Sequence, residues 1–182
     1  RAAARGPQPR MTGDLVERLL RKLEEMSCTT DRVGCLDEVP RAVARHLAAN
    51  SLGLSAVTSP PLASLEWENA GVSVAVRGAA DADLVGLTDC FCAIAETGTL
   101  MLHSAPDSPP TLSLLPETHV AVVPLERIVP TMEEAFARFC AQFSDMPPAV
   151  NFISGPSRTA DIEQTIVLGA HGPCRVHVVL VG

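Results

Sequence analysis

The sequence predicts an α/β fold in three layers, with a mostly parallel, mixed sheet covered by helices. Hydrophobic residues make up 47% of the 182 residues and aromatic residues only 3%. The core must therefore consist of Ala, Val, Leu and Ile, as buried parallel strands require. Strand-like apolar runs alternate with segments of helical spacing, which is the rhythm of parallel strands joined by helices. The chain is also long enough for one domain with a full core.

The first part of the chain is predicted to form two helices and then two short strands. Residues 12–26 carry leucines at helical spacing, with the threonine that opens the segment as the helix cap. The pattern breaks at residues 28–31, and a second helix is expected over residues 36–50. Strands are expected over residues 52–58 and 72–76, and two prolines end the first of them.

The second part of the chain is predicted to contain further strands, two helices and a proline-rich loop. The strands are expected over residues 92–95, 99–102, 119–123, 149–154 and 176–181, the helices over 131–143 and 159–168, and the loop over 106–110. The first two of these strands are hinged at Gly98, which gives the sheet an antiparallel pair. Thr131 is expected to cap the first helix.

Charge and hydropathy argue against several classes of function. The net charge is −7, so no general electrostatic attraction draws this chain to nucleic acid or to anionic membranes. The mean hydropathy is +0.22, yet no run of 18 apolar residues predicts a membrane span. Residues 1–11 read as a flexible lead without the apolar core of a secretory signal. Residues 12–182 read as one domain, in which segment 12–27 packs on the body or on a partner, and a cytoplasmic location is expected.

Three polar turns, at residues 95–99, 154–158 and 168–173, and the residue Thr159 that follows the second turn carry the candidate site residues. Because ligands in open α/β sheets collect beyond the carboxyl ends of strands, we expect these turns to converge on one cleft. Such a set can bind an anionic metabolite and move a proton. The candidate catalytic residues are Glu96 and His171, and the candidate ligand-binding residues are Thr97, Gly98, Thr99, Ser154, Gly155, Ser157, Arg158, Thr159 and Gly172.

Each of these residues also has a structural explanation. The second turn is predicted to open a helix, where backbone N–H groups and Arg158 would hold an anion, but Ser157 or Thr159 could equally be a helix cap. Glu96 is either paired or exposed at a strand end, or it is a functional acid, base or nucleophile. His171 is either an ordinary loop residue or points into the cleft, and Arg158 is either an anion clamp or part of a surface ion pair.

The six cysteines do not have the spacing of a metal site. Cys90 and Cys92 form the only close pair, and on a strand they would face the same side, a poor spread for a tetrahedral ligand set. We therefore expect small, buried, apolar cysteines, with no metal ion or cluster held by this chain. No dinucleotide fingerprint, P-loop, zinc-protease or serine-hydrolase motif is present.

Several short segments stand in a characteristic order from residue 86 to the C-terminus. They read AIAETGTL at 93–100, LSLLP at 112–116, HVAVVP at 119–124, ISGPSRTADIE at 153–163 and GAHGP at 169–173. This ordered set closely resembles the lactate-utilization protein C (LUD domain, DUF162) family. The resemblance implies a fold similar to those of ribose-phosphate isomerase, glucosamine-phosphate deaminase and CoA transferase.

The resemblance also implies a role in oxidising L-lactate to pyruvate, in a system whose companion subunits carry iron–sulfur clusters. This chain would then be an accessory subunit, or one that binds a small carboxylate or phosphate, and would hold no cofactor itself. The alternative is a stand-alone enzyme that acts on a phosphorylated or CoA-linked metabolite with Glu96 as base or nucleophile. A third reading is a pure interaction module. Relatives often have a glycine-rich loop with a basic residue where this chain has neither, at residues 105–110.

Overall fold

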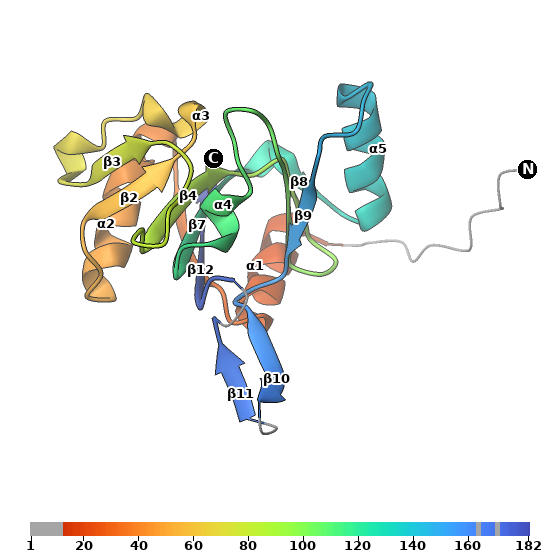
Figure 1. The fold of residues 1–182 in the computed structure, drawn as a ribbon. Helices are drawn as coiled ribbons and strands as arrows, with labels where there is room; N and C mark the ends of the chain where they lie inside the picture. Colours follow the sequence, from red (N-terminus) through yellow and green to blue (C-terminus); the bar gives the residue numbers. More distant parts are fainter. Residues whose placement is uncertain (1–12, 163–164, 170–171) are drawn as a thin grey trace, which may run out of the picture.

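Six parallel strands form the main sheet of the computed structural model, which describes residues 13–162, 165–169 and 172–182 (Figure 1). Their order is β1–β12–β7–β4–β2–β3, and every neighbouring pair is parallel. The strands are β1 (Thr29–Val33), β2 (Ser55–Thr58), β3 (Ser73–Val76), β4 (Val85–Asp89), β7 (Thr118–Pro124) and β12 (Arg175–Val181). The predicted parallel sheet is confirmed. Two of its strands were not expected, since β1 begins in the predicted break and β4 lies in a segment with no strand assigned.

A second, smaller sheet contains the predicted antiparallel pair. Its strands are β5 (Cys92–Ile94), β6 (Thr99–His103), β8 (Ile128–Val129) and β9 (Val150–Ile153), in the order β8–β5–β6–β9. β6 is antiparallel to both β5 and β9. The hinge at Gly98 therefore turns the chain back within the small sheet and does not extend the main one.

Three helices of eleven residues each cover the sheets. The helical elements are α1 (Leu15–Glu25), α2 (Val39–Ala49), α3 (Pro60–Ala63), α4 (Thr111–Leu114), α5 (Met132–Gln142) and three 3₁₀ turns, Leu36–Glu38, Glu68–Ala70 and Leu125–Arg127. Thr131 caps α5 as predicted. The cap of α1 is Asp14, whose carboxylate accepts from Val16 N at 2.7 Å, and not the predicted Thr12, which lies outside the described residues. Within the described part of the chain, no helix is long and apolar enough to cross a bilayer.

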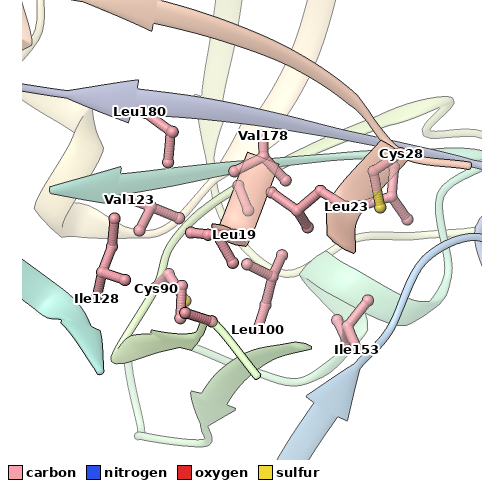
Figure 2. Packing of buried hydrophobic residues seen from close by; sticks show 14 of the residues in the cluster. Leu19, Leu23, Cys28, Cys90, Leu100, Val123, Ile128, Ile153, Val178 and Leu180 are labelled. Carbon is pink, nitrogen blue, oxygen red and sulfur yellow. The ribbon is translucent and has the colours of Figure 1, made fainter. Parts of the chain in front are cut away.

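Alternate side chains of the main sheet point to opposite faces, and each face packs against a different layer. Val120 and Val122 of β7 face α2, whereas Ala121 and Val123 face α1 and the small sheet. Figure 2 shows Leu19 of α1 among residues of both sheets. Helix α1 thus packs on the body of this chain and, with the small sheet, forms the layer opposite α2. The far side of the small sheet packs against α5.

The helix predicted over residues 159–168 is wrong. The chain instead forms an antiparallel hairpin of β10 (Arg158–Ile162) and β11 (Thr165–Leu168), in which Arg158 pairs with Leu168. This hairpin projects from the lower end of the molecule in Figure 1. Five of the ten residues from 159 to 168 are β-branched Thr, Ile or Val, and such residues favour an extended backbone over a helix.

Candidate functional site

The first two predicted turns meet through a chain of hydroxyl groups. Thr99 Oγ1 lies 2.7 Å from Thr97 Oγ1 and 2.7 Å from Ser154 Oγ. The antiparallel register of β6 and β9 pairs the residues Leu100 and Ile153, which places Thr99 and Ser154 side by side at the same end of the small sheet. Thr99 is buried while Thr97 and Ser154 are exposed, so the chain of hydroxyls runs from the interior to the surface.

Both turns press against the last turn of α1 at a glycine. Gly98 has φ +69°, and a Cβ atom there would lie 2.8 Å from the carbonyl carbon of Lys22. Gly155 has φ +91°, and its Cβ atom would overlap the carbonyl oxygen of Met26. Only glycine combines this backbone conformation with so close an approach. The end of α1 is therefore the support on which the two turns are held.

Helix α1 ends in a Schellman motif that positions Ser27 for Arg158. Cys28 N donates to Leu23 O at 2.9 Å and Ser27 N to Glu24 O at 2.8 Å, with Ser27 in the left-handed region at φ +64°. The guanidinium of Arg158 donates to the Ser27 hydroxyl. Arg158 is thus tied to the junction between α1 and β1.

The third turn lies beside the second turn, and the second turn leads into a strand and not into a helix. Ser157 N donates to Pro173 O at 2.8 Å, and Gly169 N donates to Ser157 O at 3.0 Å. Gly172 also lies close to Ser157, because a Cβ atom there would be 3.4 Å from Ser157 Cβ. Since Ser157 leads into β10 and its N–H is already bonded, the predicted anion site at a helix N-terminus is wrong. The helix-cap explanation fails for the same reason.

Neither candidate catalytic residue is joined to Arg158 by the contacts that the structure describes. Glu96 is half-buried, and its backbone N–H donates to Pro130 O at 3.0 Å. Among the described residues, no hydrogen bond or ion pair connects the Glu96 carboxylate with the Arg158 guanidinium. His171 lies outside the described residues, as does the side chain of Thr159.

The converging turns lie at the amino ends of the main strands. Ser27 comes two residues before β1 and Pro173 two residues before β12. The first two turns therefore lie beyond the carboxyl ends of β5 and β9 in the small sheet, but not beyond the carboxyl ends of the parallel sheet as predicted. This follows from the direction of the small-sheet strands, which the sequence pattern does not encode.

A cavity of about 230 Å³ opens next to these turns, between α2, β1 and β12. Its walls carry a guanidinium, an imidazole, a carboxamide, two hydroxyls and a thiol, which is a set suited to a small anion. The lining residues are Ser27, Thr29, His46, Asn50, Pro156, Cys174, Arg175 and Val176. Pro156 belongs to the predicted second turn, so the cavity adjoins the expected site.

Arg175 supplies the positive charge of the cavity. Its only described ion pair is with Glu117, at 3.7 Å between Nη1 and Oε2, and both side chains are largely exposed, at 43% and 62%. Exposed pairs of this length contribute little, so the guanidinium is available to a ligand. The imidazole of His46 stacks on that of His177 with ring centroids 3.7 Å apart.

Sequence reasoning missed His46, Asn50 and Arg175. His46 and Asn50 stand four residues apart at the end of α2, so they share one face of that helix. Arg175 opens β12. The spacing of His46 and Asn50 was a usable signal, but nothing in the sequence places the end of α2 beside the start of β12.

A second, smaller hollow lies at the opposite, carboxyl edge of the main sheet. Its volume is about 140 Å³, and its walls include Asp89, His103 and Asp107. Asp89 Oδ2 lies 3.3 Å from Arg127 Nη1. The proline-rich loop at residues 105–110 forms part of this hollow. The hollow therefore presents carboxylates where the cavity at the amino edge presents a guanidinium.

The prediction of buried, apolar cysteines holds for Cys28, Cys90 and Cys92 but is wrong for the other three, because Cys35 and Cys140 are exposed and Cys174 is half-buried. Burial raises the pKa of the Cys28 and Cys92 thiols to about 11, and it raises the pKa of Cys90 as well. A strand would place Cys90 and Cys92 on the same side, and this prediction is wrong. Cys90 packs between the two sheets and Cys92 against α5, because the chain bends at Phe91 before β5 begins.

The comparisons with known proteins agree with this fold. The LUD domain family model matches residues 16–181. The chain is 36% identical to lactate utilization protein C of Exiguobacterium sp. over 165 residues, which cover 84% of this chain and 72% of that protein. It is 38% identical to lactate utilization protein C of Bacillus subtilis over 119 residues, which cover 64% of this chain and 49% of that protein. The chain thus spans about half the length of the Bacillus relative.

A solved structure extends this similarity to three dimensions. The crystal structure of a DUF162 family protein from Deinococcus radiodurans superimposes with a TM-score of 0.68 at 26% identity. The match covers 92% of this chain and 96% of that one. Together with the family match over nearly the whole sequence, this shows that the chain belongs to the LUD domain family.

Proposed function

We propose that this protein takes part in L-lactate utilization and binds a small 2-hydroxy- or 2-oxocarboxylate in the cavity between α2, β1 and β12. The proposed process rests on the relatives named lactate utilization protein C. The proposed ligand rests on one observation, the gathering of a guanidinium, an imidazole, an amide and hydroxyls around a cavity of about 230 Å³. In a chain with a net charge of −7, such a local positive group is what an anion needs.

The lining residues divide the recognition of such a ligand between them. The Arg175 guanidinium offers paired N–H donors to the carboxylate, a geometry that Lys cannot reproduce. The hydroxyls of Ser27 and Thr29 and the amide of Asn50 can bond the oxygen at the second carbon. Arg158 donates to Ser27 of the cavity wall and so adds a second positive charge beside the cavity.

We assign the electron carriers of the reaction to iron–sulfur partner subunits. Oxidation of L-lactate to pyruvate removes two electrons and two protons, so an acceptor is required. The six cysteines include no C-x-x-C pair, and Cys90 and Cys92 are the only two that lie close in sequence, so their spacing supports no cluster on this chain. This chain would therefore serve the complex as an accessory, carboxylate-binding subunit.

Complementation of a deletion strain tests this proposal. Without the gene, growth on L-lactate as sole carbon source should fail while growth on glucose continues. The parent gene should restore growth, and Arg175→Gln should not, because it removes the charge that anchors the carboxylate. Arg41→Gln, an exposed change on α2 away from the cavity wall, is the matched control and should restore growth.

Two results would contradict the proposal. Normal growth of the deletion strain on L-lactate would remove the assigned process. Full rescue by Arg175→Gln at equal protein levels would show that the cavity is not where the ligand is held.

A further inference from the structure

Two buried ring nitrogens beside the cavity have no hydrogen-bond partner within the described residues, Nε2 of His46 and Nε2 of His177. Their rings stack with centroids 3.7 Å apart and planes inclined by only 15°. The N–H bond and the lone pair of an imidazole lie in the ring plane, so two stacked rings cannot satisfy each other. A buried polar atom without a partner is unfavourable and requires an explanation.

The neighbouring bonds decide which nitrogen of His46 carries the proton. Asn50 Nδ2 donates to His46 O at 2.8 Å and lies 3.5 Å from His46 Nδ1. Because an amide nitrogen only donates, this neighbour favours the tautomer in which Nδ1 accepts and Nε2 carries the proton. His46 lines the cavity, and His177 lies behind it, 3% exposed, with its Nδ1 2.9 Å from Thr29 Oγ1. His46 therefore belongs to the cavity wall, while its own Nε2 is closed to solvent and unpaired.

Without a ligand, both rings are neutral at neutral pH. Burial lowers the pKa of His46, and Arg175 lowers it further while Asp31 opposes this. Burial and the neighbouring His46 lower the pKa of His177 to about 4. The other charged groups facing the pair are themselves engaged, since Asp31 bonds Arg45 at 2.8 Å.

A carboxylate in the cavity would raise the pKa of one of the two imidazoles, that of His46, and would favour its protonated form. Its negative charge would stabilise the imidazolium form of His46. Two positive rings at a separation of 3.7 Å would repel each other strongly, so the pair can accept one proton but not two. The added proton would go to Nδ1 of His46, and Asn50 Nδ2 would move away from Nδ1 because two donors cannot bond each other.

We propose that this cavity binds a small monocarboxylate together with one proton, which His46 takes up while His177 positions its ring. The proposal rests on the proposed function, because it requires an anion in this cavity. The carboxylate comes from solution with its negative charge, the proton comes from solvent, and no bond of the ligand is broken. The ligand class is accordingly a small acid bound as carboxylate plus proton.

Calorimetric titration of the full chain with L-lactate tests this directly. The titration is run near pH 7 in Tris and in bis-Tris, which differ in ionisation enthalpy and carry no anionic group. The apparent binding enthalpy should differ between the buffers by the amount expected for up to one proton per lactate. The affinity should also fall as the pH rises, by up to about tenfold per pH unit.

Two variants separate His46 from other histidines. His46→Gln should still bind L-lactate, more weakly, with no buffer dependence. His103→Gln, which changes a histidine of the small sheet, should keep the proton uptake of the parent. If His46→Gln fails to fold, ¹⁵N NMR of the parent's histidine rings replaces it, and L-lactate should shift the His46 nitrogens toward imidazolium values.

The outcomes distinguish the two proposals. Equal enthalpies in both buffers with normal binding, or unchanged His46 ring shifts in the bound state, would overturn the proton uptake and leave the proposed function standing. Absence of L-lactate binding would overturn both.

Discussion

Ser27 occupies a left-handed backbone position that glycine usually fills at the end of a helix. Its φ is +64°, and it follows α1 in a Schellman motif. Ser51 has φ +55° and closes α2 with the same pair of bonds, Leu52 N to Leu47 O and Ser51 N to Ala48 O. Serine at such a position is strained. At Ser27 the strain accompanies a hydroxyl that holds Arg158 and lines the cavity.

Replacing Ser27 by glycine should therefore separate stability from binding. Ser27→Gly should raise the free energy of unfolding by about 0.5–1 kcal/mol, because glycine adopts the left-handed conformation with less strain. It should weaken carboxylate binding, because the hydroxyl is lost. Ser51→Gly is the control and should give a similar gain in stability with unchanged binding. Urea denaturation and calorimetric titration measure the two effects, and a loss of stability in both variants would refute the assignment of strain.

At the level of elements, the end of α1 is the support for the first two polar turns. Gly98 and Gly155 both combine a positive φ with an approach to the α1 backbone that leaves no room for a Cβ atom. The two turns belong to strands of the small sheet, yet α1 leads into the main sheet. The packing of these turns on α1 therefore fixes the small sheet relative to the amino edge of the main one.

Gly155→Ala should destabilise the protein by about 2–4 kcal/mol, because it adds both a strained φ and a contact with the Met26 backbone. Gly53→Ala is the matched control. Gly53 has open space around its Cβ position and no positive φ, so this change should alter the free energy of unfolding by less than about 0.5 kcal/mol. Chemical denaturation measures both. Equal stabilities of the two variants would show that the turn does not rest on α1.

The sequence predicted elements well where hydrophobic periodicity decides the backbone. The three long helices and strands such as β7 and β12 follow their apolar patterns closely. The hairpin β10–β11 differs from the predicted helix, because polar residues spaced among isoleucines imitate helical periodicity although the β-branched residues favour strands. The cavity residues could not be predicted, because His46 and Arg175 meet only through the order of strands in the sheet.

On the scale of the whole molecule, the two edges of the main sheet differ in charge. The amino edge carries the cavity with Arg175 and His46, and the carboxyl edge carries the hollow with Asp89 and Asp107. Carboxyl edges are the usual place for ligands in open α/β sheets. Here the chemistry of the walls favours the opposite edge for an anion, which is a property of the assembled fold and of no single motif.

A crystal structure of the protein soaked with L-lactate tests this placement most directly. We predict a lactate molecule in the cavity between α2, β1 and β12, with its carboxylate on the Arg175 guanidinium and beside the His46 imidazole. Lactate bound instead in the hollow beside Asp89 and His103, or a cavity without lactate at saturating concentration, would contradict it.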